Sequence, residues 1–365
     1  MLQQIDPSDY AAQLAGKQRE MEALFAPFDP PPLEVFDSAP LHFRMRAEFR
    51  IWHEGKRAHY AMMAPGERTP RPIDSFAIGS TAMVNAMTPL LDAINGSELL
   101  RLKLYGCEFL TTSRNQVLVT LIYHKPLDDT WHQHASDMAA ALGIGIIGRS
   151  RKQKRVTGED FVTEYLEVDG KTYSYQQVES GFTQPNARVN ERMLSWAKDV
   201  TAASNDEDLL ELYCGNGNFT VVLAANFRRV LATEVAKISV QSAQVNLEAN
   251  GVDNVVIARM SSEEISEALA GKRAFFRLRD VDLDSYRFST LFLDPPRAGL
   301  DDATLRLAAK FNKILYISCN PLTLKENMNF LHNTHEIRRF ALFDQFPYTH
   351  HIECGVWLCA RNSVI

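Results

Sequence analysis

Two hydrophobic patterns divide the chain near residue 180. In the first, over residues 41–63, apolar and polar side chains alternate one by one. A period of two predicts a half-buried β-strand, and His53 to Lys56 supplies the turn to a second strand that runs through Tyr60. We therefore predict a hairpin whose buried face carries Phe43, Met45, Ala47, Phe49 and Ile51 and whose polar face carries Arg44, Arg46, Glu48 and Arg50.

The rest of the first half mixes strand pairs with helices. Apolar spacing predicts an opening helix over 8–26 with Ser8 as its N-cap, and further helices over 80–94 and 129–142. Strand patterns cover 100–110, 116–123, 144–148, 161–168 and 172–176. We therefore expect residues 1–178 to form an α+β domain of its own.

From residue 186 onward, apolar strands alternate regularly with helices. The predicted helices cover 186–202, 219–226, 236–250, 262–269, 302–311 and 322–331, and the predicted strands cover 209–213, 230–233, 255–258, 290–293 and 313–317. This alternation predicts a Rossmann-like, doubly wound parallel sheet over residues 179–365. Two last strands, 336–343 and 355–360, are expected to finish the sheet as an antiparallel edge.

Composition narrows the class of protein. With 365 residues, of which 45% are hydrophobic, the chain is long enough for two globular domains. The chain has no apolar run of about 20 residues and starts with a polar, acidic segment, so we expect a cytoplasmic protein outside the membrane. Five cysteines without a Cys-x-x-Cys pair argue against disulfides and against a zinc or iron–sulfur site, and we expect no metal. The net charge of −6 gives no general sign of nucleic-acid binding.

The first candidate for ligand binding is the loop from Gly215 to Gly217, between a predicted strand and a predicted helix. Glycines let the backbone approach a ligand, and a helix start offers free N–H groups; a plain tight turn is the alternative. Glu234 ends the next strand, where a carboxylate can accept hydrogen bonds from two ribose hydroxyls. Thr220 stands in place of the third glycine of the dinucleotide motif. The combination favours S-adenosylmethionine over NAD.

Two other strand ends carry candidate reaction residues. Asp294-Pro295-Pro296 is typical of enzymes that methylate exocyclic amines, although Arg297 stands where those enzymes have an aromatic residue. Cys319 ends the following strand, and a thiolate that adds to C6 of uracil would make C5 nucleophilic enough to take a methyl group. A nearby Arg297 would lower the thiol pKa from about 8.5 to about 7. A buried core thiol is the alternative for Cys319.

The C5 proton must then be removed by a base. The loop from Asp344 to Gly355 offers His350, His351 and Glu353, and spacing alone does not choose among them. The adjacent histidines also suit a metal pair or a plain surface. The remaining cysteines, Cys107, Cys214, Cys354 and Cys359, are interpreted as packing residues.

Basic side chains gather at two places in the first half. Lysines and arginines that contact phosphates give salt-sensitive, sequence-independent affinity, whereas a solvated charged face is the alternative. The first cluster, in an expected turn between two strands, is Arg149, Arg151, Lys152, Lys154 and Arg155; the second, on the predicted hairpin, is Arg44, Arg46 and Arg50. A stacked loop uridine would have to swing out to reach a thiol, and hypothetical stacking partners for it are Phe346, Tyr348 and His350.

Five segments together closely resemble the tRNA (uracil-5-)-methyltransferase family. They are Phe182 to Asn186, Glu211 to Phe219, Asp294 to Gly299, Ser318 to Pro321 and His350 to Gly355, and the likeness also includes Phe43 to Arg50. The resemblance covers nearly the whole chain. It implies that Cys319 is the nucleophile and Glu353 the base, and that S-adenosylmethionine is contacted by Gln184, Tyr213, Asn218, Glu234 and Asp294.

The resemblance also implies the substrate. Such enzymes methylate C5 of a uridine in the tRNA T-loop to give ribothymidine, so the expected partner is the tRNA T-arm, with other RNAs of T-loop-like fold as further candidates. Cys107 is alone in the N-terminal half, which counts against the ribosomal RNA branch with its four-cysteine motif. We expect a monomer with an RNA-binding first domain. Two rival functions are N-methylation through Asp294 and an RNA chaperone that binds tRNA without methyl transfer.

Overall fold

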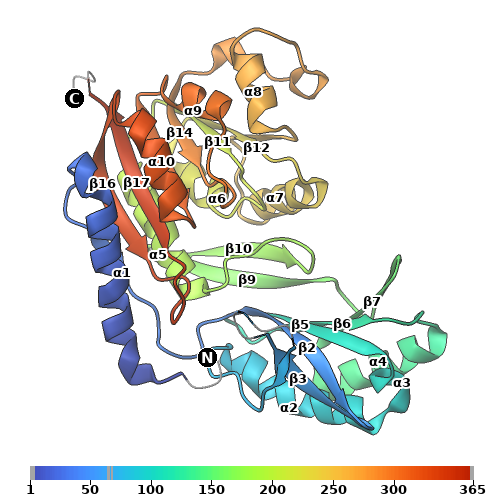
Figure 1. Ribbon diagram of the computed structural model, residues 1–365. Helices are drawn as coiled ribbons and strands as arrows, with labels where there is room; N and C mark the ends of the chain where they lie inside the picture. Colours follow the sequence, from blue (N-terminus) through green and yellow to red (C-terminus); the bar gives the residue numbers. More distant parts are fainter. Residues whose placement is uncertain (1–4, 64–65, 67–68, 362–365) are drawn as a thin grey trace. The chain divides into compact units, whose positions relative to one another are not determined.

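The computed structural model describes residues 5–63, 66 and 69–361, which fall into two compact units (Figure 1). The first unit comprises residues 39–165 and 176–187 with the start of the chain up to Ser8. The second comprises residues 9–38, 166–175 and those from Arg188 onward. The predicted domains, 1–178 and 179–365, stay a prediction; in the structure, residues 9–38 and 166–175 group with the later part of the chain.

Seven strands form the sheet of the first unit. Their order is β4 (Arg71–Pro72), β3 (Arg57–Met62), β2 (Arg46–Glu54), β5 (Leu104–Thr111), β6 (Val117–Tyr123), β7 (Gly145–Ser150) and β8 (Gln153–Val156). The predicted hairpin is confirmed as β2 and β3, and Ala47, Phe49 and Ile51 are buried as the alternation required. Helices α2 (Thr81–Gly96) and α4 (Asp129–Leu142) pack on this sheet.

Two predictions for the first unit are wrong: the start of one strand and the structure of the basic segment. The strand expected from residue 100 begins at Leu104, because Ser97 caps the short helix α3 (Glu98–Arg101) by accepting a hydrogen bond from Leu100 N. The basic segment expected to be a turn is itself a hairpin, in which Arg149 of β7 pairs with Lys154 of β8. Its cations therefore lie mostly on strands.

Eight strands form the sheet of the second unit. Their order is β1 (Glu34–Phe36), β16 (His335–Phe343), β17 (Glu353–Ala360), β15 (Lys313–Ser318), β14 (Phe288–Leu293), β11 (Asp208–Leu212), β12 (Arg229–Thr233) and β13 (Val255–Ala258). The strands from β15 to β13 are parallel, and the chain order reverses between β14 and β11. The predicted doubly wound α/β sheet is confirmed, and ligands of such sheets bind at the carboxyl ends of the strands beside the reversal.

The helices of the second unit cover both faces of this sheet. One face, with Leu212 and Tyr316, shares a buried cluster with α1 (Tyr10–Phe25), α8 (Ser262–Leu269), α9 (Asp302–Ala308) and α10 (Pro321–Leu331). The other face meets α5 (Ala187–Val200) and the start of α6 (Thr220–Leu223), while α7 (Lys237–Ala249) joins β12 to β13. Among the described residues, no helix has both the length and the apolar character needed to cross a bilayer.

The last two strands are antiparallel, as predicted, but they do not form the outer edge. β17 lies between β15 and β16, and β1 pairs in parallel with β16 on the far side. The pattern did not reveal β1, because this strand has only three residues and follows a run of prolines.

The opening helix begins later than predicted. Ser8 lies in a 3-10 turn, Pro7–Asp9, where its hydroxyl donates to Asp6 Oδ1 (2.7 Å), and α1 starts at Tyr10. Ser8 is therefore not the N-cap, because a local Ser–Asp bond engages its hydroxyl.

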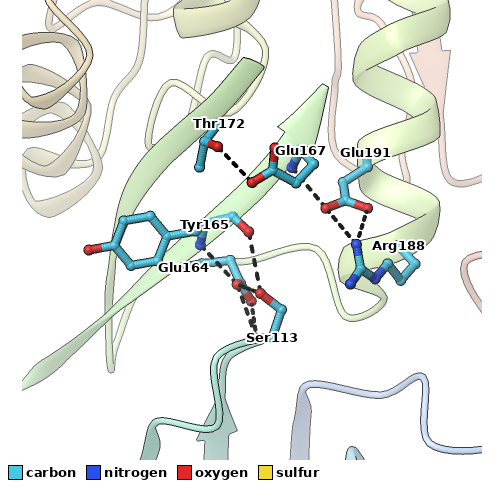
Figure 2. A network of polar contacts seen from close by, with 7 residues as sticks. All are labelled: Ser113, Glu164, Tyr165, Glu167, Thr172, Arg188 and Glu191. Carbon is cyan, nitrogen blue, oxygen red and sulfur yellow. Dashed lines mark hydrogen bonds and ion pairs between the residues drawn. The ribbon is translucent and has the colours of Figure 1, made fainter. Parts of the chain in front are cut away.

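The hairpin of β9 (Phe161–Val168) and β10 (Lys171–Val178) carries the chain from the first unit to the second and back. Figure 2 shows polar contacts made within each unit at this hairpin. In the first unit, Ser113 Oγ donates to Glu164 Oε1 (2.5 Å). In the second, Glu167 N donates to Glu191 Oε1 (2.9 Å), and Arg188 pairs with the same carboxylate. Carboxylates thus fix the hairpin strand in both units.

Candidate active site at the strand ends

The predicted cofactor loop begins where β11 ends, and its backbone turns sharply. Tyr213, Gly215 and Gly217 have φ angles of 63°, 56° and 79°, in the left-handed region that glycine adopts freely. A non-glycine residue there costs roughly 1 kcal/mol or more, and such strain clusters at functional sites. The Tyr213 hydroxyl donates to Ser262 Oγ (2.9 Å), which fixes the ring.

Glu234 follows β12 and faces this loop. Its Oε2 accepts a hydrogen bond from Gly215 N (3.1 Å), and its Oε1 accepts one from Ala236 N (2.7 Å). A carboxylate has about four acceptor positions, so both oxygens keep lone pairs for further donors. The structure therefore presents a fixed acceptor beside the loop, where the sequence predicted a ribose-binding acid.

Asn218 is held by two groups that the sequence reasoning missed. Its side-chain amide and that of Asn190 on α5 bond each other reciprocally, at 2.9 Å and 2.8 Å. Its backbone carbonyl accepts a hydrogen bond from the hydroxyl of Tyr175 (2.8 Å). Asn190 lies in a stretch of helix with no motif signal, so only the fold could reveal this pair. Gln184 lies in the irregular segment before α5 and belongs to the first unit.

The candidate reaction residues share one face of the second sheet. β15 and β17 pair Ser318 with Cys354, and continuing this antiparallel register by one residue places Cys319 opposite Glu353. Asp294 directly follows β14, whose Leu293 pairs with Tyr316 of β15. The alternation of side chains along the strands, together with the electrostatic interaction of Cys319 with both carboxyls, places Asp294, Cys319 and Glu353 on the same side.

The close packing of this face explains the glycine after Glu353-Cys354. A Cβ at Gly355 would lie 2.8 Å from Trp196 Cζ3 and 3.0 Å from Ile317 Cδ1. Real Cβ atoms do not approach that closely, so a larger residue would push α5 or β15 away. Trp196 of α5 therefore packs against this face at Gly355, two residues after Glu353.

Burial dominates the electrostatics of the face. Glu353 is 3% exposed, and burial together with the charge of Asp294 raises its pKa well above the usual value. Burial raises the pKa of Asp294 to about 7 and that of Glu211, on the neighbouring strand β11, to about 8. The carboxyls therefore hold protons more readily than exposed ones and suit proton transfer near neutral pH.

The prediction that Arg297 lowers the pKa of the Cys319 thiol is wrong for the free protein. Burial, followed by the charges of Glu353 and Asp294, raises this pKa to about 11, and Arg297 only opposes them. The sequence showed the arginine, but it did not show how close two carboxyls would come. The thiol is thus mostly protonated in the absence of ligands.

This balance predicts how Cys319 reacts with an alkylating reagent. Below a pKa of about 11 the thiolate fraction grows tenfold per pH unit, so the rate with iodoacetamide should rise about 100-fold from about pH 7 to about pH 9. At alkaline pH, where the Glu353 carboxyl is ionised, Glu353→Gln removes a negative charge and should raise the rate by about threefold or more. Mass spectrometry of labelled peptides measures this, with partly buried Cys359 as an internal control that the substitution leaves unchanged. A slower Cys319 in the variant would contradict the assigned electrostatics.

The five cysteines separate by exposure. Cys107, Cys214 and Cys354 are buried, as expected of packing residues, and Cys354 Sγ contacts Ser318 O at 3.4 Å. Cys319 is partly exposed, so its thiol is not sealed in the core. Cys359, also interpreted as a packing residue, is partly exposed and so is not fully enclosed in the core.

Internal acceptors engage several cations of the two predicted basic clusters. Arg149 bonds Glu179 through Nε (2.6 Å) and Nη2 (2.5 Å), and Lys154 pairs with Asp160 at 2.6 Å. Arg46 donates to the backbone carbonyls of Gly181 (2.6 Å) and Glu179 (2.8 Å). These cations hold the first unit together, because the structure supplies partners that are distant in sequence.

A cation–aromatic cluster on the first sheet was not predicted. The Arg50 guanidinium lies 4.3 Å from the ring centroid of Tyr105, and Tyr105 stacks on His124 with centroids 4.2 Å apart. Tyr105 is 38% exposed, and Arg50 is exposed. Only the pairing of β2 with β5 brings Arg50 to this ring, so sequence spacing gave no signal.

The predicted stacking residues lie in the loop between β16 and β17. Phe346 packs edge-on against His351 (5.8 Å between centroids), and His350 lies 4.2 Å from the same ring. Tyr348 contacts Tyr10 of α1 edge to face at 6.0 Å. Arg297 Nη2 lies 3.2 Å from His351 Nδ1, which ties this loop to the segment that follows Asp294.

Comparisons with known proteins agree with one another. The family model described as tRNA (Uracil-5-)-methyltransferase matches residues 9–361. The tRNA/tmRNA (uracil-C(5))-methyltransferase of Azoarcus sp. is 53% identical over 358 residues, 98% of each chain. The enzyme of the same name from Cellvibrio japonicus is 55% identical over 352 residues, 96% of each chain.

A solved structure supports the fold. The Pyrococcus abyssi tRNA (uracil-54, C5)-methyltransferase in complex with S-adenosyl-L-homocysteine superposes with a TM-score of 0.70 at 20% identity, covering 96% of this chain and 83% of that one. At this identity the match speaks for a shared fold.

Proposed function

Because this chain belongs to the tRNA (uracil-5-)-methyltransferase family, we propose that it methylates C5 of a uridine in the tRNA T-loop through a covalent adduct with Cys319. The family and the enzyme class expected from the sequence are confirmed. The proposal concerns the position of the uridine in the RNA, the adduct and the residues that make it.

One observation carries the proposal. A partly exposed thiol and a buried carboxyl stand opposite each other at the ends of β15 and β17, with Asp294 on the same face. A C5 methylation needs a nucleophile for C6 and a base for the C5 proton within one pyrimidine ring of each other. An N-methylation through Asp294 would use neither Cys319 nor Glu353.

The residues beside the glycine loop fit S-adenosylmethionine, which supplies an electrophilic methyl group when bound. Glu234 keeps free lone pairs for ribose hydroxyls, and Asn218 and Tyr213 are fixed beside it. Asp294 is a half-buried carboxyl with a raised pKa, and such a group gains from a cationic neighbour. We assign these four residues and Gln184 to cofactor contacts.

In the proposed reaction, Cys319 and Glu353 have different roles. Cys319 Sγ, after its proton passes to solvent or to a neighbouring carboxylate, adds to C6, and the electron pair of the C5–C6 double bond moves onto C5. C5 would then take the methyl group as the bond from that group to the sulfonium sulfur breaks and S-adenosylhomocysteine leaves. The Glu353 carboxylate takes the C5 proton, the double bond re-forms, and the thiolate leaves C6. Burial makes Glu353 a stronger base than an exposed carboxylate, which suits removal of a weakly acidic proton.

The first unit supplies features that suit RNA. Arg50 and the stacked Tyr105 and His124 combine a cation with exposed aromatic rings, the combination that binds unpaired bases and phosphates. We infer that residues 1–178 form the RNA-binding domain, that residues 179–365 form the methyltransferase domain, and that the T-arm is the ligand. The names of the relatives include tmRNA, which supports a second RNA with a T-loop-like fold.

Free cysteines suit a cytoplasmic enzyme, and a monomer remains our expectation.

Transfer RNA that carries 5-fluorouridine in the T-loop tests the proposal. Fluorine does not leave as a cation, so Glu353 cannot complete the reaction, and the methylated adduct should survive denaturing electrophoresis. The matched control is tRNA with 5-fluorouridine at every uridine except that of the T-loop. Methyl transfer without any adduct, or equal adduct with the control RNA, would overturn the proposal.

A further inference from the structure

Helix α1 carries one charge in an otherwise apolar buried stripe. Lys17, Met21 and Phe25 recur every four residues and are all buried. Phe25 packs on Phe340 of β16 with ring centroids 4.9 Å apart, and Figure 1 shows the helix beside that strand. Burial of Met21 and Phe25 favours docking of the helix on the sheet. Apolar packing does not explain why the charged side chain of Lys17 is buried in the same stripe.

The ammonium of Lys17 reaches the point where β16 ends. Its Nζ donates to Asp344 Oδ1 (2.7 Å) and to the carbonyl oxygen of Phe346 (2.9 Å). The side chains of Lys17 and Asp344 are 5% and 0% exposed. Buried charges tolerate little displacement, because moving either partner leaves the other unpaired away from water. The bond therefore sets both distance and direction, which apolar packing does not.

The same face of α1 contacts the loop at two further points. Gln13 Oε1 accepts a hydrogen bond from Tyr348 N (2.5 Å), and Tyr10 packs edge-on against the Tyr348 ring. Tyr10, Gln13 and Lys17 lie three and four residues apart, so they line one side of the helix. The Phe346 carbonyl also accepts a bond from Thr349 Oγ1 (2.8 Å), so Lys17 binds an already closed turn.

This loop, residues 344–352, leads directly into Glu353 at the start of β17. We propose that α1 is a positioning element for the reaction, in which Lys17 holds loop 344–352 so that Glu353 and the loop aromatics meet the target base. Lys17 is a positioning residue that acts through Asp344 and Phe346. The inference rests on the proposed function, since it assigns Glu353 as the base.

Two variants separate positioning from mere stability. Lys17→Met leaves Asp344 buried and unpaired, so it should lower both the thermal midpoint and the single-turnover rate of adduct formation with 5-fluorouridine tRNA. Lys17→Met/Asp344→Leu removes both charges and should restore most of the thermal midpoint. Its adduct rate at saturating RNA should still be about tenfold or more below wild type, because the loop is no longer fixed. Affinity for S-adenosylhomocysteine, measured by calorimetry, should stay within about twofold of wild type in both variants.

A second ion pair of the same unit, in which the carboxylate is buried and the arginine is half-buried, provides the control. Asp208 is 0% exposed and pairs with Arg228. Asp208 begins β11, so it lies at the amino ends of the parallel strands, whereas the reaction residues lie at the carboxyl ends. Arg228→Met/Asp208→Leu also removes a buried carboxylate together with its cation and should leave the adduct rate at the wild-type level. If Lys17→Met/Asp344→Leu forms adduct at the wild-type rate, or loses S-adenosylhomocysteine affinity in parallel, α1 has no positioning role. Failure of the wild type to form adduct would instead refute the proposed function.

Discussion

Cys319→Ala should abolish methyl transfer, with the rate of tritium transfer from labelled S-adenosylmethionine to tRNA falling by about 10⁴-fold or more. Without sulfur, C6 is not attacked and C5 stays too electron-poor to take a methyl group. The partly exposed thiol at the end of β15 is the nucleophile that we propose, because the described face places it opposite Glu353. The variant should also form no adduct with 5-fluorouridine tRNA on denaturing gels.

Cys359→Ala is the matched control for this result. Cys359 is partly exposed like Cys319 and lies on the adjacent strand β17, paired with Lys313 at the other end of β15. Its loss should leave both the methylation rate and the adduct unchanged. If Cys319→Ala kept more than about a tenth of the wild-type rate, covalent catalysis would be refuted and direct N-methylation beside Asp294 would become the better explanation.

Glu353→Gln should stop the reaction one step later. The amide cannot accept the C5 proton, so the methylated ring stays bound to Cys319 and turnover should fall by about 10³-fold. With ordinary tRNA, for which wild type releases product, the variant should accumulate an adduct that carries labelled methyl. Gel mobility under denaturing conditions and the label in the shifted band measure both effects.

Glu336→Gln makes the same chemical change on the neighbouring strand. Glu336 lies near the far end of β16, pairs with Arg338 and is remote in register from Glu353. The Glu336→Gln enzyme should methylate tRNA at the wild-type rate and accumulate no covalent adduct. A Glu353→Gln enzyme that releases methylated tRNA at the wild-type rate would show that another group, such as His350 or His351, removes the proton.

The periodicity of the chain predicted most of the second sheet. Strands such as β14 and β15 are short buried runs between helices of regular length, so their pattern is local and readable. The strand β1 was missed because it is stabilised by pairing with β16, about 300 residues away, rather than by its own sequence. Likewise Ser8 has the composition of an N-cap, but a nearby Asp6 engages its hydroxyl.

For the candidate site as well, the sequence predicted some features and missed others. Motif residues such as Cys319, Asp294 and Glu234 stand at strand ends, where a doubly wound sheet gathers ligand-binding groups. Their electrostatics could not be predicted, because the pKa of Cys319 depends on burial and on two carboxyls that come near only in the folded sheet. Asn190 and Lys17 carry no motif at all, and their roles come from partners on other elements.

The sequence by itself determined the class of fold, the family and the residue types at the ends of the strands. Those properties follow from local hydrophobic period and from short motifs. The tertiary structure alone decided which cations are free to meet RNA, how strongly the thiol holds its proton and what steadies the loop before Glu353. Each of these depends on the distance between charges that lie far apart in the chain, and electrostatic energy is set by that distance and by burial.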